Sequence, residues 1–148
     1  MSNILLIHPS RRIVGKRDNL FTNESLVPSL GLASIAAYCQ RHGIEPEIID
    51  LRLPHRSLED VINCIRRKNP VFVGITAFTF EITSAHAVAT YIKRFFPKMP
   101  VVIGGPHVSI IPVETLSEFQ DFDIAVVGEG EETTVEVTKL IESGRHGE

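Results

Sequence analysis

Short apolar runs alternate with amphipathic stretches along most of this chain. Segments of strand length with apolar centres lie at residues 4–7, 47–50, 71–76, 101–103 and 123–127. Continuous apolar runs are typical of strands covered on both faces, as in parallel sheets. We therefore expect five buried strands.

Amphipathic helices are predicted between these strands, at about residues 30–42, 58–68, 83–96, 112–118 and 131–142. Ser29 and Ser57 stand at the expected N-caps, and Gly43 and Gly144 at helix ends. The expected buried stripes are Leu32, Ile35, Ala36 and Cys39; Leu58, Val61, Ile62 and Ile65; Ala85, Val88, Ala89, Ile92 and Phe96; and Val135, Leu140 and Ile141.

Alternating strands and helices indicate parallel strands joined by right-handed crossovers. Five such units predict an α/β fold with a doubly wound, flavodoxin-like or Rossmann-like five-stranded parallel sheet. The expected strand order is 2-1-3-4-5, with helices on both faces. Residues 1–148 contain no repeat and no linker, so we expect a single domain.

Composition argues against several functional classes. The chain has 148 residues, of which 43% are hydrophobic and 22% charged, as in globular proteins. Its net charge of −3 gives no indication of nucleic-acid binding. No apolar run approaches the roughly 20 residues of a membrane helix, and the start lacks a signal peptide, so we expect a cytoplasmic protein. Cys39 and Cys64 fit buried core positions, without disulfide or metal spacing.

Ligands of such sheets bind at the carboxyl ends of the strands. There the fourth strand ends in Gly104, Gly105, Pro106 and His107. Two glycines leave bare backbone, which either forms an ordinary turn or admits a bulky ligand or another backbone.

Two further loops lie at this edge. Residues 76–80 contain Phe78 and Phe80, which we expect to pack under a helix or to line a pocket. Residues 128–132 place glycines and carboxylates at a helix start, where they complement the helix dipole or contact a ligand. The long polar loop at residues 10–28 is expected to be functional.

Several chemistries are disfavoured. The first loop has neither a phosphate-binding loop nor a dinucleotide fingerprint. The third strand ends in Thr76 and Ala77, where a phospho-receiver needs an aspartate. His8 and His107 lie at the ligand edge, but no catalytic triad or metal cluster accompanies them. We expect no self-sufficient catalytic centre.

Taken together, the segments PSLGLASIAAY (28–38), VGITAFT (73–79), IGGPHVS (103–109) and DIAVVGEGE (123–131) resemble one known pattern. It is that of the N-terminal cobalamin-binding domain of cobalamin-dependent radical S-adenosylmethionine enzymes. The resemblance covers nearly the whole chain. It implies that the corrinoid lies across the carboxyl ends of the strands, with its nucleotide tail beside Gly104 and Gly105.

The resemblance also implies which residues bind the cofactor, and it implies no catalytic residue and no metal ligand in this chain. The cofactor-binding residues it indicates are Thr76, Ala77, Phe78, Thr79, Gly104, Gly105, Pro106, His107, Gly128, Glu129 and Gly130.

The sequence departs from the family pattern in two places. Many cobalamin domains carry Asp-x-His-x-x-Gly after the first strand, and here residues 8–15 read HPSRRIVG. The resemblance then implies that the cofactor's base is displaced without a histidine ligand on cobalt, and that a residue of loop 10–28 lies under the corrin. The chain also lacks the Cys-x-x-x-Cys-x-x-Cys cluster of the radical domain.

By this resemblance the chain is the cobalamin-binding part of a longer methyltransferase or cyclase. The parent would add a C-terminal radical domain with a 4Fe-4S cluster and S-adenosylmethionine, and this chain alone would not be catalytic. Two alternatives stay open. One is a structural or interaction module with a degenerate corrinoid site, and the other is a stand-alone flavodoxin-like enzyme acting on a small molecule.

Overall fold

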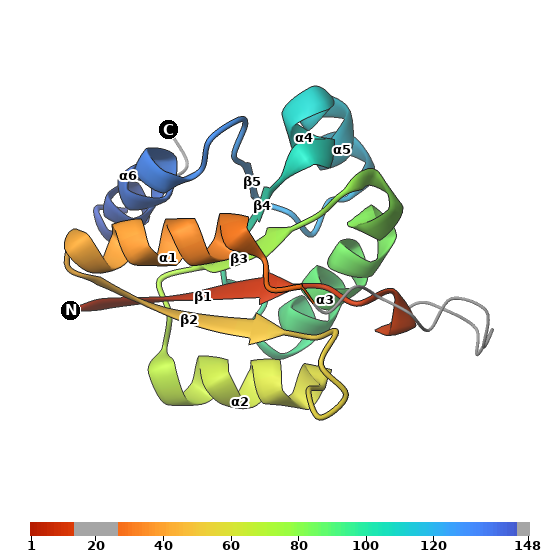
Figure 1. The fold of residues 1–148 in the computed structure, drawn as a ribbon, viewed down its shortest axis with the longest axis horizontal. Coiled ribbons are helices and arrows are strands. Elements are labelled where there is room, and N and C mark those ends of the chain that lie inside the picture. The colour runs from red at the N-terminus through yellow and green to blue at the C-terminus, as the bar shows by residue number, and fades with distance from the viewer. Residues whose placement is uncertain (14–26, 145–148) are drawn as a thin grey trace.

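The computed structural model describes residues 1–13 and 27–144, and its centre is a parallel five-stranded sheet (Figure 1). The strand order is β2-β1-β3-β4-β5, which confirms the predicted topology. The strands are β1 (Ser2–His8), β2 (Ile44–Asp50), β3 (Val73–Thr76), β4 (Val101–Gly104) and β5 (Ile124–Ala125).

Helices cover both faces of this sheet. In Figure 1, α1 (Leu30–Arg41) and α6 (Glu131–Glu142) lie on one face, while α2 (Leu58–Lys68) and α3 (Ile82–Phe95) lie on the other. Shorter elements follow the carboxyl ends of the strands. They are the 3-10 turns η1 (Arg11–Ile13) and η2 (Thr79–Glu81) and the helices α4 (Pro106–Ile110) and α5 (Pro112–Glu118).

The helix ends follow the expected capping chemistry. The Ser29 hydroxyl accepts a hydrogen bond from the Leu32 N–H at 3.3 Å, which satisfies a free donor of the first turn of α1. Gly43 ends α1 with a φ of +75°, a conformation that glycine adopts without strain. Asp60 accepts a hydrogen bond from the Ser57 N–H at 2.8 Å and so stabilises the start of α2.

Alternate residues of the strands form two cores. The α2/α3 core contains Leu5, Ile7, Val73, Ile75, Val101 and Ile103, packed against residues such as Cys64, Val88 and Ile92. The α1/α6 core contains Ile4, Leu6, Phe72, Val102 and Val126, packed against Leu32, Cys39, Val135 and Val137. Burial raises the pKa of the Cys39 thiol to about 11. Both cysteines are therefore buried core residues, as predicted.

Four local expectations differ from the structure. Strand β2 is longer than predicted because it pairs with all of β1 from Ile44 onward, and β5 is shorter because it pairs only with β4. Residues 106–110 form the helix α4 instead of an open loop, since Pro106 fits the first turn of a helix. Leu140 is 42% exposed, because it lies outside the helix stripe formed by Thr134, Thr138 and Ile141.

Among the described residues, no helix is both long enough and apolar enough to cross a membrane.

Candidate functional site

A cavity of about 630 Å³ opens on the α1/α6 face of the sheet, at the carboxyl ends of β1, β3 and β4. The first turns of α1 and α6 and the loops after β4 and β5 complete its walls. Its apolar lining includes Leu6, Leu32, Ile35, Phe72, Val102 and Val126, and its polar lining includes His8, Ser29, Arg52, Thr76, Glu129, Glu131 and Thr134.

Two glycines in neighbouring strands, Gly74 and Gly104, line this cavity. A Cβ added to Gly104 would meet no atom within 4 Å, so this position faces open space. A Cβ added to Gly74 would lie 3.0 Å from the Leu6 side chain and 3.4 Å from Phe72. Sequence reasoning missed Gly74 as a site residue. The available signal was a glycine inside an apolar strand, which often marks a close approach.

Gly105 has a different role from Gly104. Its φ is +99°, and an added Cβ would lie 2.7 Å from the Thr76 hydroxyl and 2.9 Å from the backbone of Ala77. The Ala77 N–H donates to the Gly104 carbonyl at 3.1 Å, and the His107 N–H donates to the Ala77 carbonyl at 3.3 Å. At Gly105 the approaching group is therefore another backbone, whereas Gly104 opens onto the cavity.

The structure brings most of the expected site residues to one cavity. Those that line it are Thr76, Phe78, Gly104, Gly105, Pro106, Gly128, Glu129 and Gly130. The other three lie next to it. Ala77 is buried in the α2/α3 core, and Nδ1 of the buried His107 ring lies 3.1 Å from the Thr79 hydroxyl oxygen.

The two phenylalanines of the β3 loop stack on one another at the surface. Their ring centroids are 5.5 Å apart and their planes differ by 2°. Phe78 is 50% exposed and lines the cavity, which is one of the two arrangements predicted for these rings. Phe80 is 64% exposed and does not line the cavity. The guanidinium of Arg11 lies 5.4 Å from the Phe80 ring centroid, a cation–π contact.

His8 ends β1 in a buried position at the cavity. Its Nδ1 lies 2.8 Å from the Pro9 carbonyl oxygen, and because a carbonyl only accepts, this nitrogen is the donor. Its Nε2 lies 3.8 Å from a carboxylate oxygen of the buried Glu81. The other Glu81 oxygen accepts from the Phe78 N–H at 3.1 Å. Nδ1 of His8 thus has a hydrogen-bond partner in the protein, while Nε2 lies beyond hydrogen-bond distance of the Glu81 carboxylate.

Arg52 reaches the cavity from the loop after β2 and pairs with Asp50. The guanidinium makes two charged hydrogen bonds to the carboxylate, at 2.9 and 2.7 Å, and another to the Val27 carbonyl at 3.0 Å. Burial by itself raises the pKa of Asp50, but the hydrogen bonds and charge of Arg52 outweigh it and lower this pKa. Sequence reasoning missed this pair, for which an Asp-x-Arg at a strand end was the signal.

The start of α6 is fixed against α1. A Cβ on Gly130 would lie 2.8 Å from the Ile35 side chain, so this glycine lets the two helices approach closely. The Glu131 carboxylate accepts from the Ser34 hydroxyl at 2.7 Å. That hydrogen bond, together with a backbone N–H of Glu131 itself, lowers the pKa of Glu131.

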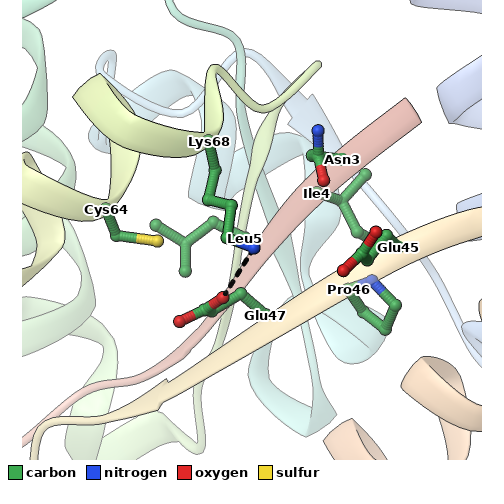
Figure 2. Close-up of a pocket in the computed structure, with 8 residues that line it drawn as sticks. All are labelled: Asn3, Ile4, Leu5, Glu45, Pro46, Glu47, Cys64 and Lys68. Atoms are coloured by element: carbon green, nitrogen blue, oxygen red, sulfur yellow. Dashed lines mark ion pairs between the residues drawn. The ribbon is translucent and has the colours of Figure 1, made fainter. Parts of the chain in front are cut away.

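A second, much smaller cavity lies beside the last turn of α2 (Figure 2). It has a volume of about 10 Å³, room for about one water molecule. Lys68 and Glu47 face each other across it, with Nζ 3.8 Å from a carboxylate oxygen. Of these two cavities, only the one at the carboxyl edge is large enough for an organic ligand.

In residues 1–13 and 27–144, no group of three or more His, Cys, Asp or Glu side chains could hold a metal ion. The predicted functional loop at residues 10–28 lies largely outside the described residues, so its contact with a ligand stays a prediction.

Comparison with known families agrees with this geometry. The model of the B12 binding domain family matches residues 17–138, which is most of the chain. The chain belongs to the B12 binding domain family. Its resemblance to the cobalamin-binding domain of cobalamin-dependent radical S-adenosylmethionine enzymes is thereby confirmed.

Curated relatives are much longer than this chain. It is 36% identical over 118 residues to an uncharacterized methyltransferase of Pyrococcus horikoshii, covering 80% of this chain and 26% of the relative. It is 29% identical over 119 residues to the anaerobic magnesium-protoporphyrin IX monomethyl ester cyclase of Rubrivivax gelatinosus, covering 80% and 21%. The chain thus spans about a quarter or less of these relatives.

Solved structures show the same fold. The cobalamin-dependent S-adenosylmethionine radical enzyme OxsB, with aqua-cobalamin and S-adenosylmethionine bound, matches with a TM-score of 0.74 at 14% identity. This match covers 97% of this chain and 19% of OxsB. The response regulator TrrA of Thermotoga maritima matches with a TM-score of 0.57 at 15% identity, covering 95% of this chain and 99% of TrrA. At these identities the likeness concerns the fold.

Proposed function

We propose that this chain binds cobalamin, with the nucleotide tail of the cofactor in the 630 Å³ cavity and the corrin at the carboxyl edge of the sheet. The observation that carries the proposal is the open space in front of Gly104, where a Cβ would meet nothing within 4 Å. Apolar side chains such as Leu6, Phe72 and Val102 suit the flat base of the tail, because such sites are mostly apolar.

We also propose that no histidine of this edge ligates the cobalt. Nδ1 of His8 donates to the Pro9 carbonyl, Nδ1 of His107 pairs with the Thr79 hydroxyl, and both rings are buried. Cobalt bound here would then take no nitrogen ligand from these residues. The electron paramagnetic resonance spectrum of the bound cobalt(II) form tests this, because a nitrogen ligand splits its lines. We expect no such splitting, and a splitting that disappears in His8→Ala or His107→Ala would contradict the proposal.

Retention of cobalamin by the purified chain tests the main proposal. The protein is mixed with hydroxocobalamin, desalted and examined by visible absorbance. We expect wild type to retain the cofactor and Gly104→Leu to bind it roughly tenfold or more weakly, about 1.4 kcal/mol, because the leucine fills the cavity. Ala37→Leu is the matched control, since Ala37 is exposed on α1 and does not line the cavity.

Two outcomes would contradict cobalamin binding at this site. If wild type retains no cofactor, a structural or interaction module with a degenerate site becomes the better account. If Gly104→Leu and Ala37→Leu both retain it as wild type does, binding occurs elsewhere.

For the whole protein, we propose that this domain works with a radical S-adenosylmethionine domain carrying a 4Fe-4S cluster, in methyl transfer or ring cyclisation. The named methyltransferase and cyclase relatives and the OxsB match support this. A Cys-x-x-x-Cys-x-x-Cys cluster in the same gene, beyond residue 148, tests it. A cytoplasmic location stays a prediction.

A further inference from the structure

Ser109, in α4, connects two loops that line the cavity. Its hydroxyl donates to the Gly105 carbonyl at 3.0 Å and accepts from the Gly128 N–H, also at 3.0 Å. Gly105 belongs to the loop after β4, and Gly128 to the loop after β5. Ser109 itself does not line the cavity, so it acts from behind the wall.

Only one of these two hydrogen bonds is expected from local structure. A serine in a helix often donates to the carbonyl four residues earlier, which accounts for the bond to Gly105. The bond from Gly128 crosses from a segment 19 residues away. It also involves a residue with a φ of +77°, so the hydroxyl fixes the peptide of a turn that glycine makes possible.

This hydroxyl lies just beyond the end of the β4–β5 ladder. The last paired residues are Ile103 and Ala125, and the Val126 N–H donates to the Ile103 carbonyl at 2.9 Å. No strand pairing of β4 with β5 continues past this point in the described residues. Ser109 therefore supplies the connection between the two strands where the sheet no longer does.

The outer sides of the two loops are fixed by other contacts. The Gly105 loop packs against the backbone of Ala77, and Gly130, two residues after Gly128, packs against Ile35 of α1. Ser109 connects the two loops from behind, so that the wall of the cavity is continuous from β3 to α1.

We propose that Ser109 is a positioning residue that holds the β4 and β5 loops together and so sets how tightly the cavity retains the nucleotide tail of cobalamin. The part that concerns retention rests on the proposed function. The part that concerns the loops rests on the two hydrogen bonds alone.

Amide hydrogen exchange at Gly128 tests the loop contact without any cofactor. In Ser109→Ala we expect the Gly128 amide to exchange roughly tenfold faster than in wild type, because it loses its acceptor. Ser109→Thr keeps a hydroxyl and is expected to exchange as wild type does. An unchanged Gly128 amide in Ser109→Ala would overturn the proposal, and so would a threonine variant that exchanges as fast as the alanine variant.

Retention of two corrinoids tests the functional part. Cobalamin has the nucleotide tail and cobinamide lacks it, so Ser109→Ala is expected to weaken cobalamin binding about five- to tenfold and to leave cobinamide binding unchanged. Equal weakening of both, together with a fall in the free energy of unfolding, would indicate a general structural role and overturn the proposal.

The two proposals fail differently in this experiment. A wild-type chain that retains no cobalamin overturns the proposed function and, with it, the role of Ser109 in retention. If wild type retains cobalamin and Ser109→Ala retains it equally well, only the inference about Ser109 is overturned.

Discussion

The two faces of the sheet share the same strands but differ at their carboxyl ends. On the α2/α3 face, Ile75 and Ile103 are almost fully buried in a closed core. On the α1/α6 face, the next positions of the same strands are occupied by Thr76 and Gly104, and a cavity takes the place of packed side chains. Neighbouring residues in one strand thus serve opposite purposes.

This difference follows from the alternation of side chains along a strand. We call the α1/α6 face, with its cavity, the hollow face and the α2/α3 face the closed face. A larger side chain at position 104 alters only the hollow face, and a change at Ile103 alters only the closed face. The closed face can therefore supply the stability that the hollow face gives up, and each face can be tested separately.

The largest expected effect is on the closed face. Ile103→Ala should lower the free energy of unfolding by about 2–5 kcal/mol, because it removes buried methyl groups and leaves a cavity. Denaturant unfolding measures this, with the exposed Ile110→Ala as control, for which about 0.5 kcal/mol or less is expected. A loss for Ile103→Ala as small as that of the control would show that this face is not closely packed.

Substitutions of the adjacent glycines Gly104 and Gly105 should differ in their effect on the free energy of unfolding. Gly105→Ala is expected to cost about 1–3 kcal/mol, because the residue has a positive φ and its Cβ would meet the backbone of Ala77. Gly104→Ala faces open space and should change stability by about 0.5 kcal/mol or less. Equal losses would contradict the assignment of Gly105 to folding and Gly104 to the cavity.

The Arg52–Asp50 ion pair, at the cavity on the hollow face, should make a pH-dependent contribution to the free energy of unfolding. The folded-state pKa of Asp50 is lowered, so its contribution is present above the unfolded pKa, about 3.9, and is lost as the pH falls through the folded value. Asp50→Asn should therefore cost about 0.5–2 kcal/mol at pH 7 and progressively less below about pH 4. Unfolding at several pH values measures this, with the exposed Glu45→Gln as control. A pH-independent difference would show that Asp50 acts by packing and not by charge.

The smallest effect is expected where α1 meets α6. Ser34→Ala removes the hydrogen bond to Glu131, so the pKa of Glu131 should rise toward its ordinary value. The free energy of unfolding should change by only about 0.2–1 kcal/mol, because the pair is exposed. Titration of the Glu131 carboxyl by nuclear magnetic resonance measures the shift. No rise would mean that the backbone N–H and not Ser34 lowers this pKa.

The sequence predicts the fold better than the site. Strand order follows from the alternation of strands and helices, and Ser29, Ser57 and Gly43 mark helix ends because capping is local. The strand-end motifs also indicate the edge of the sheet at which the structure has its large cavity. The contact of Gly105 with Ala77 depends on how the loops after two different strands meet, so no local pattern predicts it. The Arg52–Asp50 pair is local, and Asp-x-Arg at a strand end was its signal.

Gly74 shows a second limit. A glycine inside an apolar strand does not reveal which residues pack closely over it or which face of the sheet it lies on, and the answer comes only with the register that pairs it with Leu6 and Val102. The helix α4 was missed because Pro106 directly follows two glycines and so suggests an open loop, although, like Pro112 at the start of the predicted α5, it fits the first turn of a short helix.

Each face of the sheet contains one buried cysteine, whose reaction with a thiol reagent can report when that face opens. Cys39 belongs to the α1/α6 core and Cys64 to the α2/α3 core, and a thiol reacts only as the thiolate that burial disfavours. Modification of either sulfur in the native protein therefore requires its own layer to open. The ratio of their labelling rates would show which layer opens more often, without any substitution in the chain.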